Sequence, residues 1–250
     1  MKALRPLGIA VQFLTRLPVR LASAPTDAEM GQAVLFYPAV GIIVGAPLVL
    51  IGYAIAAGFI PHLLGSAMIL AAWVMLTGGL HLDGLADSAD AWAGGRGHRE
   101  RALAIMKDPN CGPIGVVTLL LVLLLKFAAI ADLLDAGRFW ALLLPPVLGR
   151  IALPLLFYTT PYVRRGGLGE GMAVHLHRKA ALMVLIASFS VVPAGWGFIG
   201  LGALLAAVVM FVAVRRLMMA LIGGMTGDAA GAMVELVEAA SLVALTIVGR

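Results

Sequence analysis

The stretch TGGLHLDGLADSADAWAGG, residues 77–95, ends a long apolar run and carries three carboxylates within eight positions, Asp83, Asp87 and Asp90. If the run continues as a helix, they stand at i, i+4 and i+7 and share one stripe about 10 Å long. Three like charges on one face repel one another, and the cost rises near a membrane. A divalent cation with oxygen ligands would offset the repulsion, so the stretch predicts a Mg²⁺ site. A solvated helix end is the alternative, but flanking glycines and Gly84 favour close approach of a ligand.

The composition of the chain indicates a membrane protein. Of its 250 residues, 62% are hydrophobic and only 12% are charged. Soluble domains of this size are less apolar, and the apolar runs are long and continuous, as in membrane-spanning helices. We expect an all-α polytopic protein, a single integral-membrane domain over residues 1–250 with about seven transmembrane helices. The single Cys111 excludes an intrachain disulfide.

The polar interruptions divide the chain into segments. Residues 1–33 carry Arg16 and Arg20 within an apolar pattern, which suits an N-terminal helix lying in the membrane interface. The hydrophilic loops are expected at 93–112 and 159–179, and a Gly-rich break at 223–232. The expected spans are 34–59, 63 or 64 into the acidic stretch, 113–134, 138–158, the hairpin arms 180–194 and 196–214 around Gly195, and a last span to 248.

Positive charge gathers on one side of this layout. Fourteen of the eighteen Lys and Arg residues fall there, and the positive-inside rule makes that side cytoplasmic. We therefore expect a multi-pass protein of a bacterial inner membrane, with its N-terminus, the acidic stretch and Asp228 on the cytoplasmic side. The net charge of +5 suits anionic lipid or an anionic substrate and gives no reason to expect nucleic acid. The fourteen are Lys2, Arg5, Arg16, Arg20, Arg96, Arg99, Arg101, Lys107, Arg164, Arg165, Arg178, Lys179, Arg215 and Arg216.

Two polar loops add candidates for phosphate chemistry. Lys107 could neutralise a phosphate beside Asp108 as a further metal ligand, or the pair could form a solvated turn. Arg164 and Arg165, followed by two glycines, could cradle an anionic group, or the loop could simply obey the positive-inside rule. His81 lies away from the acidic stripe and is expected to be a packed polar residue.

The last span contributes Asp228, with Glu235 on nearly the same face and Glu238 further along. Carboxylates inside a span usually face the bundle interior and find a partner, and Arg150 is the natural one. That pair could serve substrate binding or be purely structural. Lys126 is expected to snorkel to the surface of the bundle.

An acidic metal site with flanking cations at a membrane face suits the transfer of a phosphate-bearing group from a diphosphate to an alcohol. Mg²⁺ would neutralise the diphosphate and stabilise the leaving nucleotide, and a carboxylate could accept the proton of the hydroxyl.

The sequence also resembles the cobalamin synthase family, the adenosylcobinamide-GDP ribazoletransferases. The resemblance rests on five motifs in order, FLTRLPV (13–19), YPAVGIIVG (37–45), GGLHLDGLADSADAWAGG (78–95), ALAIMKDPNCGPIGV (102–116) and TGDAAGA (226–232). It implies that α-ribazole, or its 5′-phosphate, attacks adenosylcobinamide-GDP, that GMP leaves, and that Mg²⁺ is required. The family pattern assigns to the site Asp83, Asp87, Asp90, Lys107, Asp108 and Asp228.

Two other functions stay open at this stage. A CDP-alcohol phosphotransferase would also carry helix-borne aspartates, but its DxxDGxxAR pattern is absent because Asp87, not Arg, follows Ala86. A cation-coupled transporter predicts broken helices and an internal repeat, and neither is evident in the sequence. The sequence leaves open whether the chain forms a homo-oligomer and how many metal ions it binds.

Overall fold

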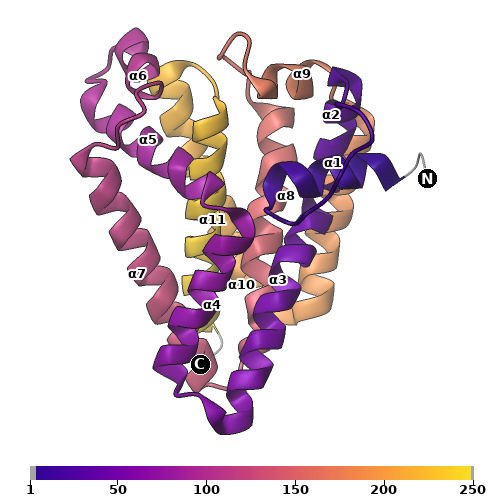
Figure 1. Cartoon of the computed structure of the whole chain (residues 1–250), viewed down its shortest axis with the longest axis vertical. Helices are drawn as coiled ribbons and strands as arrows, with labels where there is room; N and C mark the ends of the chain where they lie inside the picture. Colours follow the sequence, from indigo (N-terminus) through magenta and orange to yellow (C-terminus); the bar gives the residue numbers. More distant parts are fainter. Residues whose placement is uncertain (1–3, 249–250) are drawn as a thin grey trace.

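The computed structural model describes residues 4–248, apart from the side chain of Phe59, as a bundle of α-helices (Figure 1). Over this range there is no β-strand, only an isolated bridge between Tyr162 and Met225, so the all-α prediction is confirmed. Lys2 and Arg250 lie outside the described residues. The helices are α1 Arg5–Leu14, α2 Asp27–Ala33, α3 Tyr37–Ala54, α4 His62–Thr77, α5 Leu80–Gly94, α6 Arg99–Ile105, α7 Pro113–Asp135, α8 Leu144–Thr159, α9 Leu168–Val174, α10 Arg178–Ile222 and α11 Gly227–Val248.

Length and composition do not confirm the predicted number of membrane spans. Within the described part of the chain, five helical segments are long and apolar enough to cross a membrane, or six if α4 and α5 form one broken span. The count of seven therefore stays a prediction. The predicted spans 113–134, 138–158 and the last one agree closely with α7, with η4 (Phe139–Leu143) plus α8, and with α11.

Helix α10 counts as one segment of 45 residues, yet it folds back on itself. Arg178 at its start donates to the Tyr158 carbonyl at 2.9 Å, and Arg215 donates to the neighbouring Thr159 carbonyl at 2.7 Å. A straight helix would separate the two arginines by about 55 Å. The reversal lies at Gly197, whose backbone (φ 55°, ψ −138°) is open only to glycine. The predicted hairpin is therefore confirmed, with its turn two residues later.

The expectation of one continuous helix through the acidic stretch is wrong. Helix α4 ends at Thr77, and α5 leaves it at an angle of 88°. Gly78 and Gly79 both adopt left-handed backbone conformations (φ 65° and 70°), which terminate a helix at little cost only for glycine. The side chain of Arg16 packs against Gly78, and its backbone N–H donates to the Leu76 carbonyl at 2.8 Å. The acidic stripe thus lies on a separate helix across the end of the bundle.

The N-terminal segment forms part of this same end. Helix α1 runs across the bundle axis near α2 and α9 (Figure 1), and its apolar side packs onto the bundle through residues such as Ile9 and Leu14. An ion pair between Arg5 and Glu29, 2.6 Å from Nε to Oε1, joins α1 to α2. The amphipathic pattern that predicts an interfacial helix therefore corresponds to a helix that closes one end of the bundle. Two loops expected to be irregular contain the short helices α6 and α9.

A buried network of charges holds the middle of the bundle. Lys126 of α7 is 2% exposed, and its Nζ lies 2.6 Å from carboxylate oxygens of both Glu235 and Glu238 on α11. Arg150 of α8 is fully buried and pairs with Glu238, one of the carboxylates for which it is the expected partner. The snorkelling prediction for Lys126 is wrong, because two buried carboxylates hold it inside the bundle and it lies 4.5 Å from the ring centroid of Trp73.

Candidate active site

Helices α5 and α11 cross with their backbones in contact. A Cβ added to Gly84 would lie 2.6 Å from the carbonyl oxygen of Asp228, and one added to Gly231 would lie 3.2 Å from the carbonyl oxygen of His81. Only glycine permits this approach, which brings the carboxylates of α5 next to Asp228. Gly84, predicted to bind substrate, therefore acts in the structure as the contact point between two helices.

The carboxylates at this crossing influence one another. Asp87 lies on α5, outside the five segments that could cross a membrane individually, and its pKa is raised to about 6. Burial is the largest cause, followed by the charges of Asp83, Asp228 and Asp90, while Arg164 acts in the opposite direction. The charge of Arg164 thus offsets only part of the effect of burial and of the neighbouring carboxylates on Asp87.

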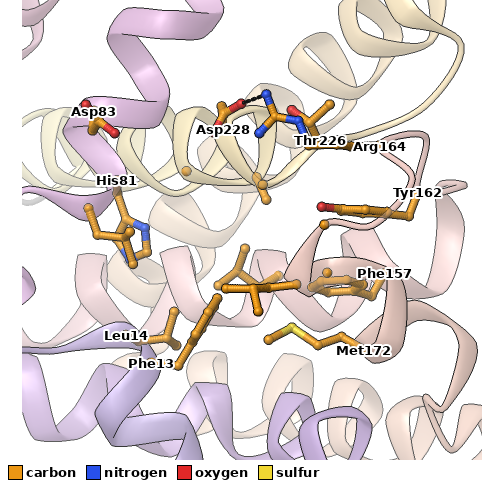
Figure 2. A pocket seen from close by; sticks show the side chains of 18 of the residues that line it. Phe13, Leu14, His81, Asp83, Phe157, Tyr162, Arg164, Met172, Thr226 and Asp228 are labelled. Atoms are coloured by element: carbon orange, nitrogen blue, oxygen red, sulfur yellow. Dashed lines mark ion pairs between the residues drawn. The ribbon is translucent and has the colours of Figure 1, made fainter. Parts of the chain in front are cut away.

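Arg164 connects three parts of the chain at the site. Its Nη2 lies 3.0 Å from Asp228 Oδ2, an ion pair drawn in Figure 2, and donates to the Met106 carbonyl at 3.1 Å. Backbone hydrogen bonds from Val163 to Met225 and from Met225 to Pro161, both 2.9 Å, fix the loop beside the start of α11. The structure places Arg164 beside Asp228, and its predicted role in binding an anionic group stays a prediction.

A cavity of about 430 Å³ opens at this crossing. Its polar end carries Asp83, Asp228, Arg164 and Thr226, while Phe13, Phe157 and Met172 lie together at the other end in Figure 2. The sequence predicts an apolar surround but not which residues form it, although the FLTRLPV motif contains Phe13 and Leu14 and the YPAVGIIVG motif begins with Tyr37. The full apolar and aromatic lining is Phe13, Leu14, Tyr37, Leu80, Leu153, Phe157, Tyr162, Leu168, Met172 and Ala230.

Asp90 has a role that the sequence did not indicate. Its Oδ2 accepts from the Gly112 N–H at 2.7 Å and its Oδ1 accepts from the Gly115 N–H at 2.9 Å. A Cβ at either glycine would lie 2.5 Å from a carboxylate oxygen of Asp90. Asp90 therefore clamps α5 to the start of α7, and its predicted role as a metal ligand stays a prediction.

Three other predicted site residues lie outside the cavity lining. Lys107 and Asp108 are exposed just after α6, and Arg165 is exposed beside Arg164. Asp108 accepts from the backbone N–H of Asn110 at 2.9 Å and from its side-chain amide at 2.8 Å, and these bonds lower the pKa of Asp108. Lys107 and Asp108 directly follow Met106, whose carbonyl accepts a hydrogen bond from Arg164. The two residues therefore lie next to the site but outside the cavity lining.

Arg150 and His81, two polar residues singled out in the sequence, are both buried. Arg150, predicted to bind substrate, is paired with Glu238 and is absent from the cavity lining. His81 is 3% exposed and lines the cavity, and its Nε2 has no hydrogen-bond partner within the described chain. It is a packed polar residue, as predicted.

The donor set suits Mg²⁺ rather than an ion that needs a full protein cage. Within residues 4–248, no three His, Cys, Asp or Glu side chains are already grouped to hold a metal ion. Mg²⁺ commonly uses one or two carboxylates and completes its shell with waters and substrate phosphates. Asp83, Asp87 and Asp228 offer carboxylates from two touching helices, and the raised pKa of Asp87 reflects its burial first and the neighbouring carboxylates second. The residues therefore fit a magnesium ion that arrives with a phosphate ligand.

Comparison with known proteins gives a consistent assignment. The family model described as cobalamin-5-phosphate synthase matches residues 6–246. Proteins named adenosylcobinamide-GDP ribazoletransferase are similar over nearly their whole length: 55% identical in Pseudomonas paraeruginosa (98% of this chain, 99% of the relative), 54% in Pseudomonas aeruginosa (98% and 99%) and 53% in Pseudomonas fluorescens (97% and 99%). No solved structure matches. The chain therefore belongs to the cobalamin-5-phosphate synthase family, a family of cobalamin-forming transferases.

Proposed function

We propose that the protein transfers the adenosylcobinamide-phosphate group of adenosylcobinamide-GDP to α-ribazole or α-ribazole 5′-phosphate. A ribose hydroxyl oxygen forms a bond to the phosphorus next to the cobinamide, the bond to the bridging oxygen breaks, and GMP leaves. The products are adenosylcobalamin, or its 5′-phosphate, and GMP. The observation that carries this proposal is the meeting of Asp83 and Asp228 with Arg164 at one end of a cavity, in a chain similar to ribazoletransferases.

Mg²⁺ is proposed as the cofactor, with Asp83, Asp87 and Asp228 as the side chains that would hold it. When bound, the ion would neutralise the diphosphate and make phosphorus more electrophilic. Asp90 supports this set through its hydrogen bonds to α7 and could add a ligand from the same helix. These residues come from both helices of the glycine-mediated crossing, so the crossing sets the distance between them.

The chain's own side chains have separate roles in this reaction. Arg164 lies within reach of the acidic end and can neutralise phosphate oxygens with its fork of N–H donors. Asp83 lines the cavity and can accept the proton of the attacking hydroxyl. The apolar walls exclude water, which would otherwise compete as the nucleophile.

We further propose that this site faces the cytoplasm across a bacterial inner membrane. The site, α1, α2, α6 and α9 lie at the same end of the bundle (Figure 1), and the loops at this end carry most of the basic residues. The lipid bilayer is accordingly a partner of the apolar outer surface, as expected from the five candidate spans.

The test is GMP release from adenosylcobinamide-GDP and α-ribazole, measured with purified protein in lipid with and without Mg²⁺. We expect turnover only with Mg²⁺, and Asp87→Asn to lower kcat/KM by at least about 100-fold, in the range of removing a key electrostatic group. Asp135→Asn is the matched control, because Asp135 lies near His62 at the opposite end of the bundle. Turnover without Mg²⁺, or wild-type activity of Asp87→Asn, would contradict the metal assignment.

The same assay separates the alternatives. The break between α4 and α5 is a feature that a transporter would also show, but the relatives carry transferase names. Absence of GMP release together with cation uptake into vesicles would favour the transporter, and CMP release from a CDP-alcohol would favour the phospholipid enzyme.

A further inference from the structure

We propose that the cavity is the binding site of the acceptor riboside, that its apolar end holds the base, and that the Tyr37 hydroxyl donates a hydrogen bond to the base nitrogen. The inference rests on the proposed function, because it takes ribazole as the acceptor. Beyond the proposed function, the inference states which of the two substrates enters the cavity and which residue recognises that substrate.

Size selects the acceptor over the donor. The cavity has a volume of about 430 Å³. Ribazole, a riboside of dimethylated benzimidazole, has about 20 non-hydrogen atoms and fills on the order of 300 Å³, whereas the corrinoid donor has on the order of 100 such atoms. The donor can therefore bring only its diphosphate to the acidic end, and its corrin must stay outside the cavity.

The distribution of polarity orients the riboside. The apolar end has Phe157 and Phe13 with Met172 close by, a lining suited to a flat aromatic base, and the carboxylates lie at the other end (Figure 2). A riboside has one apolar ring system and one hydroxyl-rich sugar. With its base among the aromatic residues, its ribose faces Asp83 and Asp228, which is where the attacking hydroxyl must lie.

Tyr37 brings to the cavity wall a hydrogen-bond donor that is poorly matched by the protein itself. Tyr37 is 1% exposed, and among the described residues its hydroxyl has only the thioether sulfur of Met172 as a partner, at 3.4 Å. Both residues line the cavity. A buried phenol normally finds an oxygen or nitrogen acceptor, and sulfur is a weak one. The benzimidazole of ribazole has a single free ring nitrogen, which in the neutral base is an acceptor and not a donor. The hydroxyl of Tyr37 and this nitrogen are complementary.

The experiment compares Tyr37→Phe with wild type on two acceptors under saturating donor, and on the donor under saturating α-ribazole. The first acceptor is α-ribazole, and the second is its indole analogue, in which the free ring nitrogen is replaced by C–H. We expect Tyr37→Phe to raise the KM for α-ribazole about tenfold, as for loss of one buried hydrogen bond, and to leave the KM for adenosylcobinamide-GDP unchanged. With the indole analogue, wild type and variant should have equal KM values.

Tyr53→Phe is the matched control, since Tyr53 is exposed on the distant end of α3 and should leave every KM unchanged. Equal KM values of wild type and Tyr37→Phe for α-ribazole, an equal loss with the indole analogue, or a rise in the donor KM instead would each overturn the inference. These outcomes are read only from an active enzyme, so they are distinct from failure of the proposed function, in which wild type itself releases no GMP.

Discussion

At the residue scale, several charged side chains of this protein have hydrogen-bond donors or opposite charges as partners, and the candidate site lies where carboxylates face one another. Asp90 has a backbone donor for each oxygen, and Lys126 has two carboxylates. For Asp87, in contrast, burial and then the like charges of Asp83, Asp228 and Asp90 raise the pKa to about 6. In the sequence, Asp83, Asp87, Asp90 and Asp228 are residues of one type. Only their partners in the structure separate Asp90, held by two backbone N–H groups, from the carboxylates proposed to hold the metal.

The clamp made by Asp90 depends on the absence of a side chain opposite it. Gly115→Ala would place a Cβ where it meets Asp90 Oδ2, so α5 and α7 must move apart and Asp90 must lose a hydrogen bond. We expect GMP release to fall at least about tenfold and the melting temperature to fall. Gly195→Ala, where a Cβ meets no atom within 4 Å, is the control and should behave as wild type. Full activity of Gly115→Ala would argue against the clamp.

Removing the buried cation Lys126 should be strongly destabilising. Lys126→Met leaves Glu235 and Glu238 with only Arg150 between them, and breaking such a buried pair costs about 3–5 kcal/mol. We expect a lower melting temperature in detergent. The double variant Lys126→Met/Glu235→Gln restores charge balance and should recover part of the loss. If the single variant melts like wild type, the network contributes little to stability.

At the element scale, two features of the helices shape the end of the bundle with the cavity. They are the sharp bend between α4 and α5 and the backbone contact of α5 with α11. Both depend on glycine, Gly78 and Gly79 in the first case and Gly84 and Gly231 in the second. The glycines are visible in the sequence. Their opposite effects, a turn in one place and a close packing in another, are visible only once the helices are placed.

The contact between α5 and α11 gives a prediction at this scale. Gly84→Ala would put a Cβ 2.6 Å from the Asp228 carbonyl oxygen, so the helices must separate by several tenths of an ångström or more. Because this contact sets the spacing of the carboxylates, we expect kcat/KM to fall about 100-fold, the order expected for a misplaced reactive group. Raising the Mg²⁺ concentration should restore part of the activity if the carboxylates hold the ion. A variant with normal activity at low Mg²⁺ would show that the crossing does not set the site.

At the scale of the whole molecule, the two ends of the bundle differ in charge and in content. One end has the cavity and the basic loops, and the other has Asp135 near His62 and the C-terminal part of α11. This asymmetry carries the proposed orientation in the membrane.

The single cysteine allows a direct test of that orientation. Cys111 is exposed and lies between α6 and α7, at the end with the cavity. A membrane-impermeant maleimide should label it in inverted membrane vesicles and leave it unlabelled in intact spheroplasts. In the variant Cys111→Ala/Asp135→Cys the pattern should reverse. Labelling of Cys111 in spheroplasts would place the end of the bundle with the cavity on the outside of the membrane.

The sequence by itself determined the helical membrane class, the family, most span boundaries and the acidic stretch, because apolar length, charge bias and motif order are properties of the chain alone. Tertiary structure decided the bend at Gly78, the clamp role of Asp90, the burial of Lys126 and the aromatic end of the cavity. Each of these depends on which residues distant in the sequence become neighbours. Local patterns predict that Tyr37 and Phe157 are apolar and helical. Only packing of α1, α3, α8 and α9 shows that they face the same space as Asp228.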